Sequence, residues 1–129
     1  MNKRRFVVAS EVAESWRDDL FTGKSPTFFP VADRGPLTRI EVGPKLITLV
    51  GGAPGAGKTA FVMQCVVDAL RLTPDLRAVV CNVEMPPEEL LDRQLSRLSG
   101  VPLEAIRYRK LGEIHAERID AGLATIESF

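Results

Sequence analysis

Apolar residues recur at helical spacing near the start of the chain. Ser10 can cap a helix that runs to about Phe21, and Gly23 stands at the position where such a helix would end. Positions spaced by about four residues place a set of apolar side chains on one face. These side chains are Val12, Ala13, Trp16 and Leu20. The pattern predicts one amphipathic helix, with Trp16 in the core.

The middle of the chain alternates strand-like and helix-like segments. Residues 23–45 contain four prolines, so they predict a connector with one short strand near 38–42. Residues 45–50 predict a strand, and residues 58–72 predict a helix that is apolar almost all round and should pack against a sheet. The β-branched run at 78–83 is typical of a strand covered on both faces.

The last third of the chain reads as helical. A helix should begin at Pro86 and Pro87 and end at Gly100, because proline suits the first helical turn and glycine the C-terminal end. A short helical turn over 103–109 and an amphipathic helix over 113–128 follow. The order β-α-β-α-α predicts an α/β fold, with a parallel sheet flanked by helices.

Composition narrows the class of protein. The 129 residues carry no formal net charge, and 45% are hydrophobic and 26% charged, as in one soluble globular domain. Balanced charge excludes a general attraction to nucleic acid or anionic membrane, and no apolar run approaches the length of a membrane span. Cys65 and Cys81 lie in apolar runs, which predicts reduced core thiols in a cytoplasmic protein.

A glycine-rich turn joins the predicted strand 45–50 to the predicted helix 58–72. It reads GAPGAGKT and fits the phosphate-binding pattern G-x-x-x-x-G-K-[ST]. Its glycines would let successive backbone N–H groups point inward, Lys58 would reach the β- and γ-phosphates, and the Thr59 hydroxyl would ligate Mg²⁺. The alternative is a plain tight turn. The candidate nucleotide-binding residues are Gly52, Ala53, Pro54, Gly55, Ala56, Gly57, Lys58 and Thr59.

Glu84 directly follows the second predicted strand, 78–83. The carboxyl ends of strands in an open parallel sheet share the ligand side, so Glu84 and the glycine-rich loop should face one crevice. A carboxylate there can orient or deprotonate the water that attacks a γ-phosphate. The alternative is a Glu84 that is solvated or caps the helix beginning at Pro87.

The segments ITLVGGAPGAGKTAFVMQ and VVCNVEMPPEELLDRQLSRLSGVPLEAIR resemble the C-terminal RecA-like domain of DnaB-type replicative helicases, as a divergent branch. The likeness runs from about Leu46 to Leu111. It implies a RecA-like P-loop ATPase over residues 45–129, preceded by a helix and proline-rich connector over 1–44. It also implies that Lys58 and Thr59 bind ATP and Mg²⁺ and that Glu84 is the catalytic glutamate.

The resemblance has further implications for activity. The family's Walker B aspartate strand, DNA-contacting loops and arginine finger would lie beyond Phe129, so we expect a partial RecA-like domain that binds nucleotide weakly and hydrolyses it poorly. The complete protein would form a hexameric ring that couples ATP hydrolysis to unwinding on single-stranded DNA in replication. Open strand edges also predict partial disorder or aggregation of the isolated chain.

Two other functions stay open at this point, a small P-loop kinase and a recombinase-like regulatory ATPase module. Trp16 has an alternative role as a subunit contact, because family linker helices pack on a neighbour in the ring. The single His115 is expected at the surface, and Met63 and Met85 are expected in the core. A basic patch is expected as a solvated face, with contact to DNA or to a partner as the alternative. It comprises Arg93, Arg97, Arg107, Arg109 and Lys110.

Overall fold

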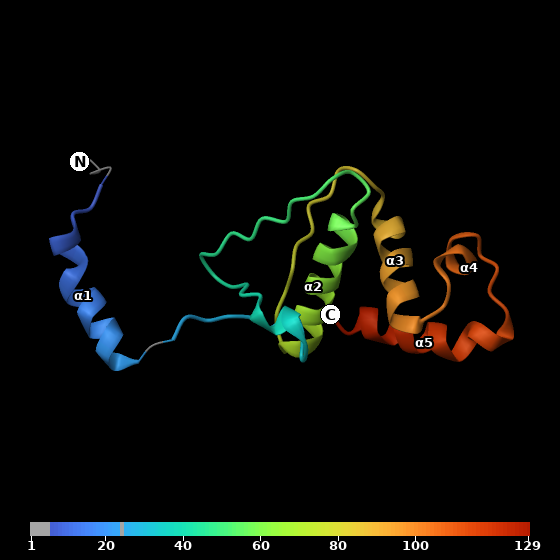
Figure 1. Cartoon of the computed structure of the whole chain (residues 1–129). Helices are drawn as coiled ribbons and strands as arrows, with labels where there is room; N and C mark the ends of the chain where they lie inside the picture. Colours follow the sequence, from blue (N-terminus) through green and yellow to red (C-terminus); the bar gives the residue numbers. More distant parts are fainter. Residues whose placement is uncertain (1–5, 24) are drawn as a thin grey trace, which may run out of the picture.

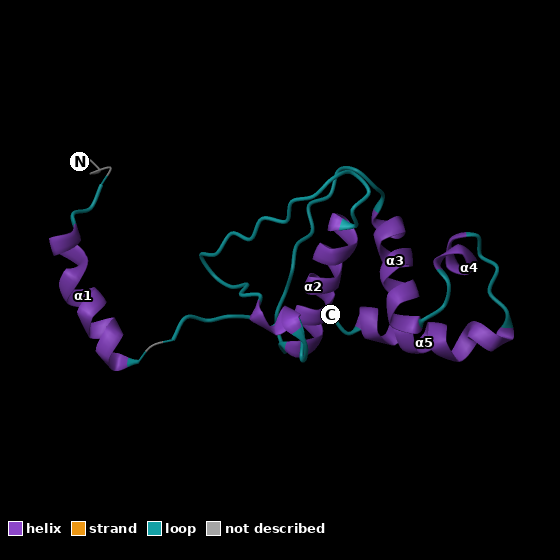
Figure 2. Ribbon diagram, in the orientation of Figure 1, coloured by secondary structure: helices purple, strands orange, loops and turns teal. Residues whose placement is uncertain are grey.

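The computed structural model describes residues 6–23 and 25–129. Five α-helices account for its regular structure, together with one short 3₁₀ helix (Figure 1). The remaining described chain is loop (Figure 2). The helices are α1 (Ala9–Thr22), α2 (Lys58–Leu72), α3 (Pro87–Ser99), α4 (Leu103–Arg107) and α5 (Glu113–Glu127), and the 3₁₀ helix spans Pro36–Arg39.

The predicted parallel sheet is absent from the described residues, so the α/β, RecA-like prediction of the fold is wrong for this structure. Segments 45–50 and 78–83 run as loop, and their apolar side chains are largely open to solvent. Ile47 is 98% exposed and Val83 100% exposed. The residue types in these segments favour strands because their side chains pack well on a pleated, half-buried surface. A strand also needs a neighbouring segment that forms hydrogen bonds with its backbone N–H and C=O groups.

Local backbone geometry also works against the first predicted strand. Lys45, its first residue, adopts a left-handed φ of 67°, which turns the chain where an extended strand should begin. The short strand expected near 38–42 is replaced by the 3₁₀ turn and one antiparallel bridge between Phe29 and Val42. The Phe29 N–H donates to the Val42 carbonyl over 2.7 Å. Among the described residues, this bridge is the only β-type pairing.

The helices that carry the candidate loop and its surroundings follow the predictions closely. Helix α2 has the predicted bounds, and α3 begins at Pro87. Gly100 ends α3 with a left-handed φ of 67° while its N–H donates to the Ser96 carbonyl. Helices α4 and α5 confirm the two last helical segments, each one or two residues shorter than predicted.

Helix α1 is present but does not join the core. Ser10 lies inside the helix and Val8 takes the N-cap position without a side-chain hydrogen bond, so the predicted cap is wrong, whereas Gly23 ends the helix as predicted. None of the α1 residues is buried, and α1 contacts no other helix in the described structure. Figure 1 shows it apart from the other helices, at the far end of the connector. Trp16 is 63% exposed, which contradicts its predicted place in the core.

Helix α3 is the centre of the packed part, because α2, α4 and α5 all contact it. Val101 and Ile106, which follow α3, are each 1% exposed. Gly122 lets α5 approach closely: a Cβ added there would lie 2.9 Å from Leu95 Cδ1 and 3.3 Å from Ser99 Cβ. The buried apolar core is small, and consists of Val31, Val67, Ala69, Leu90, Val101 and Ile106.

The two cysteines differ in environment, which corrects the prediction that both are core thiols. Cys65 on α2 is half-buried, whereas Cys81 is exposed in the loop 78–83, and both are free thiols. Burial, and next the negative charge of Asp68, raises the pKa of the Cys65 thiol. Met63 and Met85 are also half-buried.

Candidate functional site

The glycine-rich loop folds into a compact turn at the start of α2. Gly55 and Gly57 adopt left-handed φ angles of 77° and 83°, and Gly57 is the N-cap residue of α2. These backbone angles favour glycine, which explains the residue type at both positions. The Ala56 N–H closes the turn by donating to the Ala53 carbonyl over 3.2 Å. The loop therefore delivers the chain directly to the N-terminus of α2, where unpaired N–H groups favour an anion.

Gly52 differs from the other two glycines. Its φ is not left-handed, and a Cβ added there would make ordinary contacts, 3.4 Å from Ala56 Cβ and 3.6 Å from Lys58 Cγ. The backbone freedom expected of glycine is therefore used at Gly55 and Gly57, and neither backbone angle nor crowding explains the glycine at position 52.

Lys58 folds back over the loop from the first position of α2. Its Nζ donates to the Gly52 carbonyl over 2.9 Å and to the Ala53 carbonyl over 2.8 Å. An ammonium group has three N–H donors, so these two contacts hold the charge above the loop without using every donor. The next residue, Thr59, is half-buried at the second position of the helix.

One cavity of about 420 Å³, here called the loop cavity, brings the loop and Glu84 together. Its first wall, the loop wall, includes Lys58 and Thr59. Its second wall, the α3 wall, comes from the end of segment 78–85 and from α3. The loop wall is formed by Pro54, Gly55, Gly57, Lys58, Thr59 and Ala60, and the α3 wall by Glu84, Met85 and Arg93. Gly52, Ala53 and Ala56 belong to the loop but do not line the cavity.

Glu84 is exposed at the α3 wall, and its backbone is fixed by Asn82. The Glu84 N–H donates to Asn82 Oδ1 over 3.2 Å, and Asn82 Nδ2 donates to the Met85 carbonyl over 3.0 Å. Pro86 is the N-cap residue of α3 and no side-chain hydrogen bond caps this helix. The alternative role of Glu84 as a cap for α3 therefore finds no contact in the structure.

Sequence reasoning missed Arg93 as part of this site and placed it in the basic patch. Its Nη2 donates to Glu89 Oε1 over 2.8 Å, an ion pair between residues four apart on α3. That hydrogen bond is the main cause that lowers the pKa of Glu89. The Arg93 Nε is buried without a hydrogen-bond partner. The sequence did contain a signal for Arg93. A helix that starts just after Glu84 has Arg93 on its second turn, close enough to Glu84 to lie beside the same site.

The other members of the basic patch that form ion pairs have structural partners. Arg97 Nη1 lies 3.2 Å from Asp68 Oδ1 on α2, and Arg109 Nη1 lies 3.0 Å from Asp92 Oδ1 on α3. These pairs support the solvated-face interpretation of the patch. His115 is half-buried at the start of α5, where its Nδ1 accepts a hydrogen bond from the Gly112 N–H over 3.3 Å.

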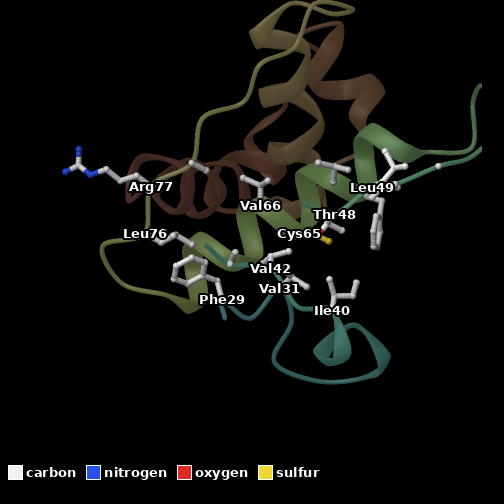
Figure 3. A pocket seen from close by; sticks show the side chains of 17 residues that line it. Phe29, Val31, Ile40, Val42, Thr48, Leu49, Cys65, Val66, Leu76 and Arg77 are labelled. Carbon is white, nitrogen blue, oxygen red and sulfur yellow. The ribbon is translucent and has the colours of Figure 1, made fainter. Parts of the chain in front are cut away.

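A second and larger hollow lies on another side of α2. This apolar groove, of about 680 Å³, runs between α2 and the loop segments around 29–43 and 48–51. Figure 3 shows Val31, Ile40 and Val42 facing Cys65 and Val66 across it. The groove takes the place of the sheet that the apolar helix 58–72 was expected to pack against. Its lining offers no carboxylate or histidine, so acid–base chemistry has no obvious group there.

Within residues 6–23 and 25–129, no group of three or more His, Cys, Asp or Glu side chains is arranged to hold a metal ion. No helix in residues 6–23 or 25–129 combines the length and apolar character needed to cross a membrane.

Comparison with known proteins adds one finding. The family model described as "DnaB-like helicase C terminal domain" matches residues 42–129, which is most of the chain. The match covers the glycine-rich loop, Glu84 and Arg93 together. No solved structure matches the chain.

Proposed function

The chain belongs to the DnaB-like helicase C-terminal domain family, and we propose on this basis that its glycine-rich loop binds the phosphates of ATP. The observation that carries the proposal is the loop cavity, a space of about 420 Å³ that Lys58, Thr59 and Glu84 line together. A cation, a hydroxyl and a carboxylate around one cavity are the groups that phosphate binding and hydrolysis require.

Each side chain has a proposed role that follows from its chemistry. Lys58 exchanges its loop carbonyls for phosphate oxygens, a charge-assisted contact that is stronger than a neutral one. The N-terminus of α2, directly behind Gly57, adds its partial positive charge. Glu84 positions the attacking water and accepts its proton.

The residues present also fit Mg²⁺ bound together with the nucleotide. The Thr59 hydroxyl and Glu84 carboxylate line the cavity, and Mg²⁺ prefers oxygen ligands supplied partly by substrate phosphates. Thr59 would hold the ion in this proposal. The bound ion would neutralise charge on the phosphate oxygens.

We further propose that this chain by itself binds ATP but turns it over slowly. Glu84 is the only carboxylate among the residues that line the loop cavity, whereas phosphoryl transfer in P-loop enzymes also uses an acidic residue that helps to hold the metal. In a complete cytoplasmic helicase of this family, hydrolysis would be coupled to unwinding by a hexameric ring on single-stranded DNA during replication. We propose a division at residues 44/45, with α1 and the connector outside the ATP-binding part, because α1 contacts no other helix and no connector residue lines the loop cavity.

Replacing Lys58 tests the proposal. Lys58→Ala should weaken binding of a fluorescent ATP analogue by 1.5 kcal/mol or more, about tenfold or greater, because a hydrogen bond to a charged group is lost. Lys110→Ala is the matched control: the charge change is identical, and Lys110 is exposed after α4, outside the loop cavity. Equal affinities for the wild type and Lys58→Ala would refute phosphate binding by this loop.

A further inference from the structure

The segment between α2 and α3 has an alternating pattern of exposure. Val79 is 90% exposed and Val83 is 100% exposed, and Cys81 between them is also exposed. At the alternate positions, Val80 is 47% exposed and Asn82 is half-buried. A period of two is the pattern of a strand that has one covered face and one open face. The open face of this segment therefore carries two valines and a cysteine.

The backbone of this segment has no partner. No N–H or C=O group of residues 77–83 forms a backbone hydrogen bond within the described chain. The segment is held beside α2 at both of its ends, because residues 76–78 line the apolar groove with Ala69 and Glu84 lines the loop cavity with Lys58. Figure 1 shows an extended run between these two ends. An unpaired, extended backbone of this kind is a template for pairing with another chain.

The composition of the segment also favours such pairing. Residues 78–83 read AVVCNV and contain no charge, proline or glycine. Six-residue segments with high strand propensity, low charge and no proline are those that pair readily with a copy of themselves. A charged residue stands at each end, Arg77 before the segment and Glu84 after it.

The alternation determines which register suits two copies of the segment. Residues that lie opposite each other in an antiparallel pair point to the same side, and a slip by one residue would turn one open face away from the other. A pair centred on Cys81 places Val79 opposite Val83 of the second copy, and this contact occurs twice. Apolar residues that lie opposite each other are the contacts that stabilise paired strands. The same patch serves both copies, as a two-fold dimer requires.

The charges at the ends of the segment favour the antiparallel direction. In that direction, the Arg77 end of each copy lies beside the Glu84 end of the other, whereas a parallel pair would bring like charges together. The other unpaired apolar run, 45–50, lacks this complementarity. It starts at Lys45 and is followed by the glycine-rich loop, with no acidic residue at its end.

We propose that segment 78–83 pairs antiparallel with the same segment of a second copy of this chain, with Cys81 on the two-fold axis. Backbone hydrogen bonds between the copies would satisfy the unpaired N–H and C=O groups, and the two valine pairs would cover the open face. The pairing does not depend on nucleotide binding. A pair of short strands buries less than the roughly 1,200 Å² of a standard interface, so the dimer should be weak and should form as the concentration rises.

The first test measures sedimentation of the whole 129-residue chain, under reducing conditions, from micromolar to near-millimolar concentration. The wild type should pass from monomer to dimer. Val79→Lys should weaken the dimer by about tenfold or more, because the lysine replaces an apolar contact that occurs twice. Val79 is open to solvent, so the monomer should fold as before, which thermal unfolding checks. Ile47→Lys is the matched control, since Ile47 is 98% exposed in the run 45–50.

The second test reports the register, through the thiol of Cys81. Opposite residues of an antiparallel pair have Cα atoms about 4.5–5.5 Å apart, which lies within the range of about 4.4–6.8 Å that a disulfide allows. Oxidation with copper–phenanthroline should therefore produce a covalent dimer of the wild-type chain. The covalent dimer should persist in Cys65→Ala, disappear in Cys81→Ala and form more slowly in Val79→Lys.

The charge at the start of the segment provides a third test. Arg77→Glu would place two acidic ends side by side at both ends of the pair, so it should weaken the dimer. The loss should be larger at low salt than at high salt, because salt screens exposed charges.

Several outcomes would overturn the inference. A wild-type chain that stays monomeric up to near-millimolar concentration, or a dimer that Val79→Lys leaves intact, excludes pairing through this segment. A dimer that Ile47→Lys weakens as much as Val79→Lys does would pair through the run 45–50 as well. A covalent dimer that needs Cys65 instead of Cys81 would exclude the proposed two-fold axis.

Discussion

Lys58 and Glu84 are held at the loop cavity by different kinds of contact. The Lys58 ammonium is bound by two loop carbonyls through its own side chain, at 2.9 and 2.8 Å. The Glu84 carboxylate is placed through its backbone, which the Asn82 side chain ties into the turn before α3. Under the proposed function, phosphate would therefore compete with two backbone oxygens for Lys58, whereas the contacts that place Glu84 do not involve its carboxylate.

Glu84→Gln provides the prediction at the scale of the residue. In a complete helicase that contains this domain, the substitution should leave ATP affinity unchanged and lower turnover by about 10² to 10⁴, the usual contribution of a general base. Steady-state ATP hydrolysis with single-stranded DNA measures the effect. Glu88→Gln, in the first turn of α3 and outside the cavity, is the control. Retained turnover in Glu84→Gln would exclude a catalytic glutamate at this position.

At the level of the residue, the sequence predicted those features that depend only on neighbouring positions in the chain. The loop pattern is contiguous from Gly52 to Thr59, and two of its glycines, Gly55 and Gly57, have their reason within the turn itself. Arg93 was not predicted at the cavity: its spacing from Glu84 places it on the second turn of α3, but its closeness to the glycine-rich loop depends on how α3 packs beside α2. The ion pair of Arg93 with Glu89 follows from their spacing of four residues on a helix. The cavity that Arg93 lines does not follow from any spacing in the sequence.

Helices and strands differ in what their formation requires. Helix α2 satisfies its own backbone from Lys58 to Leu72, so its bounds follow from the loop before it and the turn 73–77 after it. The segments 45–50 and 78–83 have strand-like composition, but a strand takes its hydrogen bonds from another segment, and none of the described residues supplies them. The predicted helices were therefore largely confirmed and the predicted sheet was not.

Gly122→Ala gives the prediction at the scale of the element. A Cβ at this position meets Leu95 Cδ1 at 2.9 Å and Ser99 Cβ at 3.3 Å. The Leu95 end can rotate away, but Ser99 is fixed on α3, so overpacking of about 1–3 kcal/mol should exceed the gain of about 1 kcal/mol in helix propensity. We expect a net loss of about 1 kcal/mol in the free energy of unfolding, measured by urea denaturation.

Ala121→Gly is the matched variant for this measurement. Ala121 is exposed on α5 next to Gly122, so the substitution reports the propensity contribution alone. If Gly122→Ala stabilised the protein by as much as Ala121→Gly destabilises it, helix propensity alone would explain both changes. That outcome would show that α5 does not pack tightly on α3.

The molecule as a whole consists of a small packed unit around α3 and a helix that stands apart from it (Figure 1). The buried apolar side chains lie in the connector, α2, α3 and the segment after α3, and none lies in α1. Amphipathic spacing correctly predicted that α1 is a helix. It could not show which surface covers its apolar face, and Trp16 is accordingly open to solvent.

Trp16 reports on this arrangement directly, because it is the only tryptophan of the chain. In dilute solution its emission should resemble that of water-exposed tryptophan, and acrylamide should quench it nearly as well in the folded chain as in urea. The reason is its 63% exposure on a helix that contacts no other. Blue-shifted emission with strong protection from acrylamide would mean that another surface covers α1.

The two walls of the loop cavity belong to different helices, α2 and α3. The width of the cavity therefore depends on the distance between these helices. The loop wall moves with α2 and Arg93 moves with α3, while the Arg97–Asp68 ion pair joins the two helices. Helix α3 in turn rests on α5 at Gly122. We therefore expect a side chain inserted between α5 and α3 to shift Arg93 relative to Lys58 and, under the proposed function, to change the affinity for phosphate from the far side of α3.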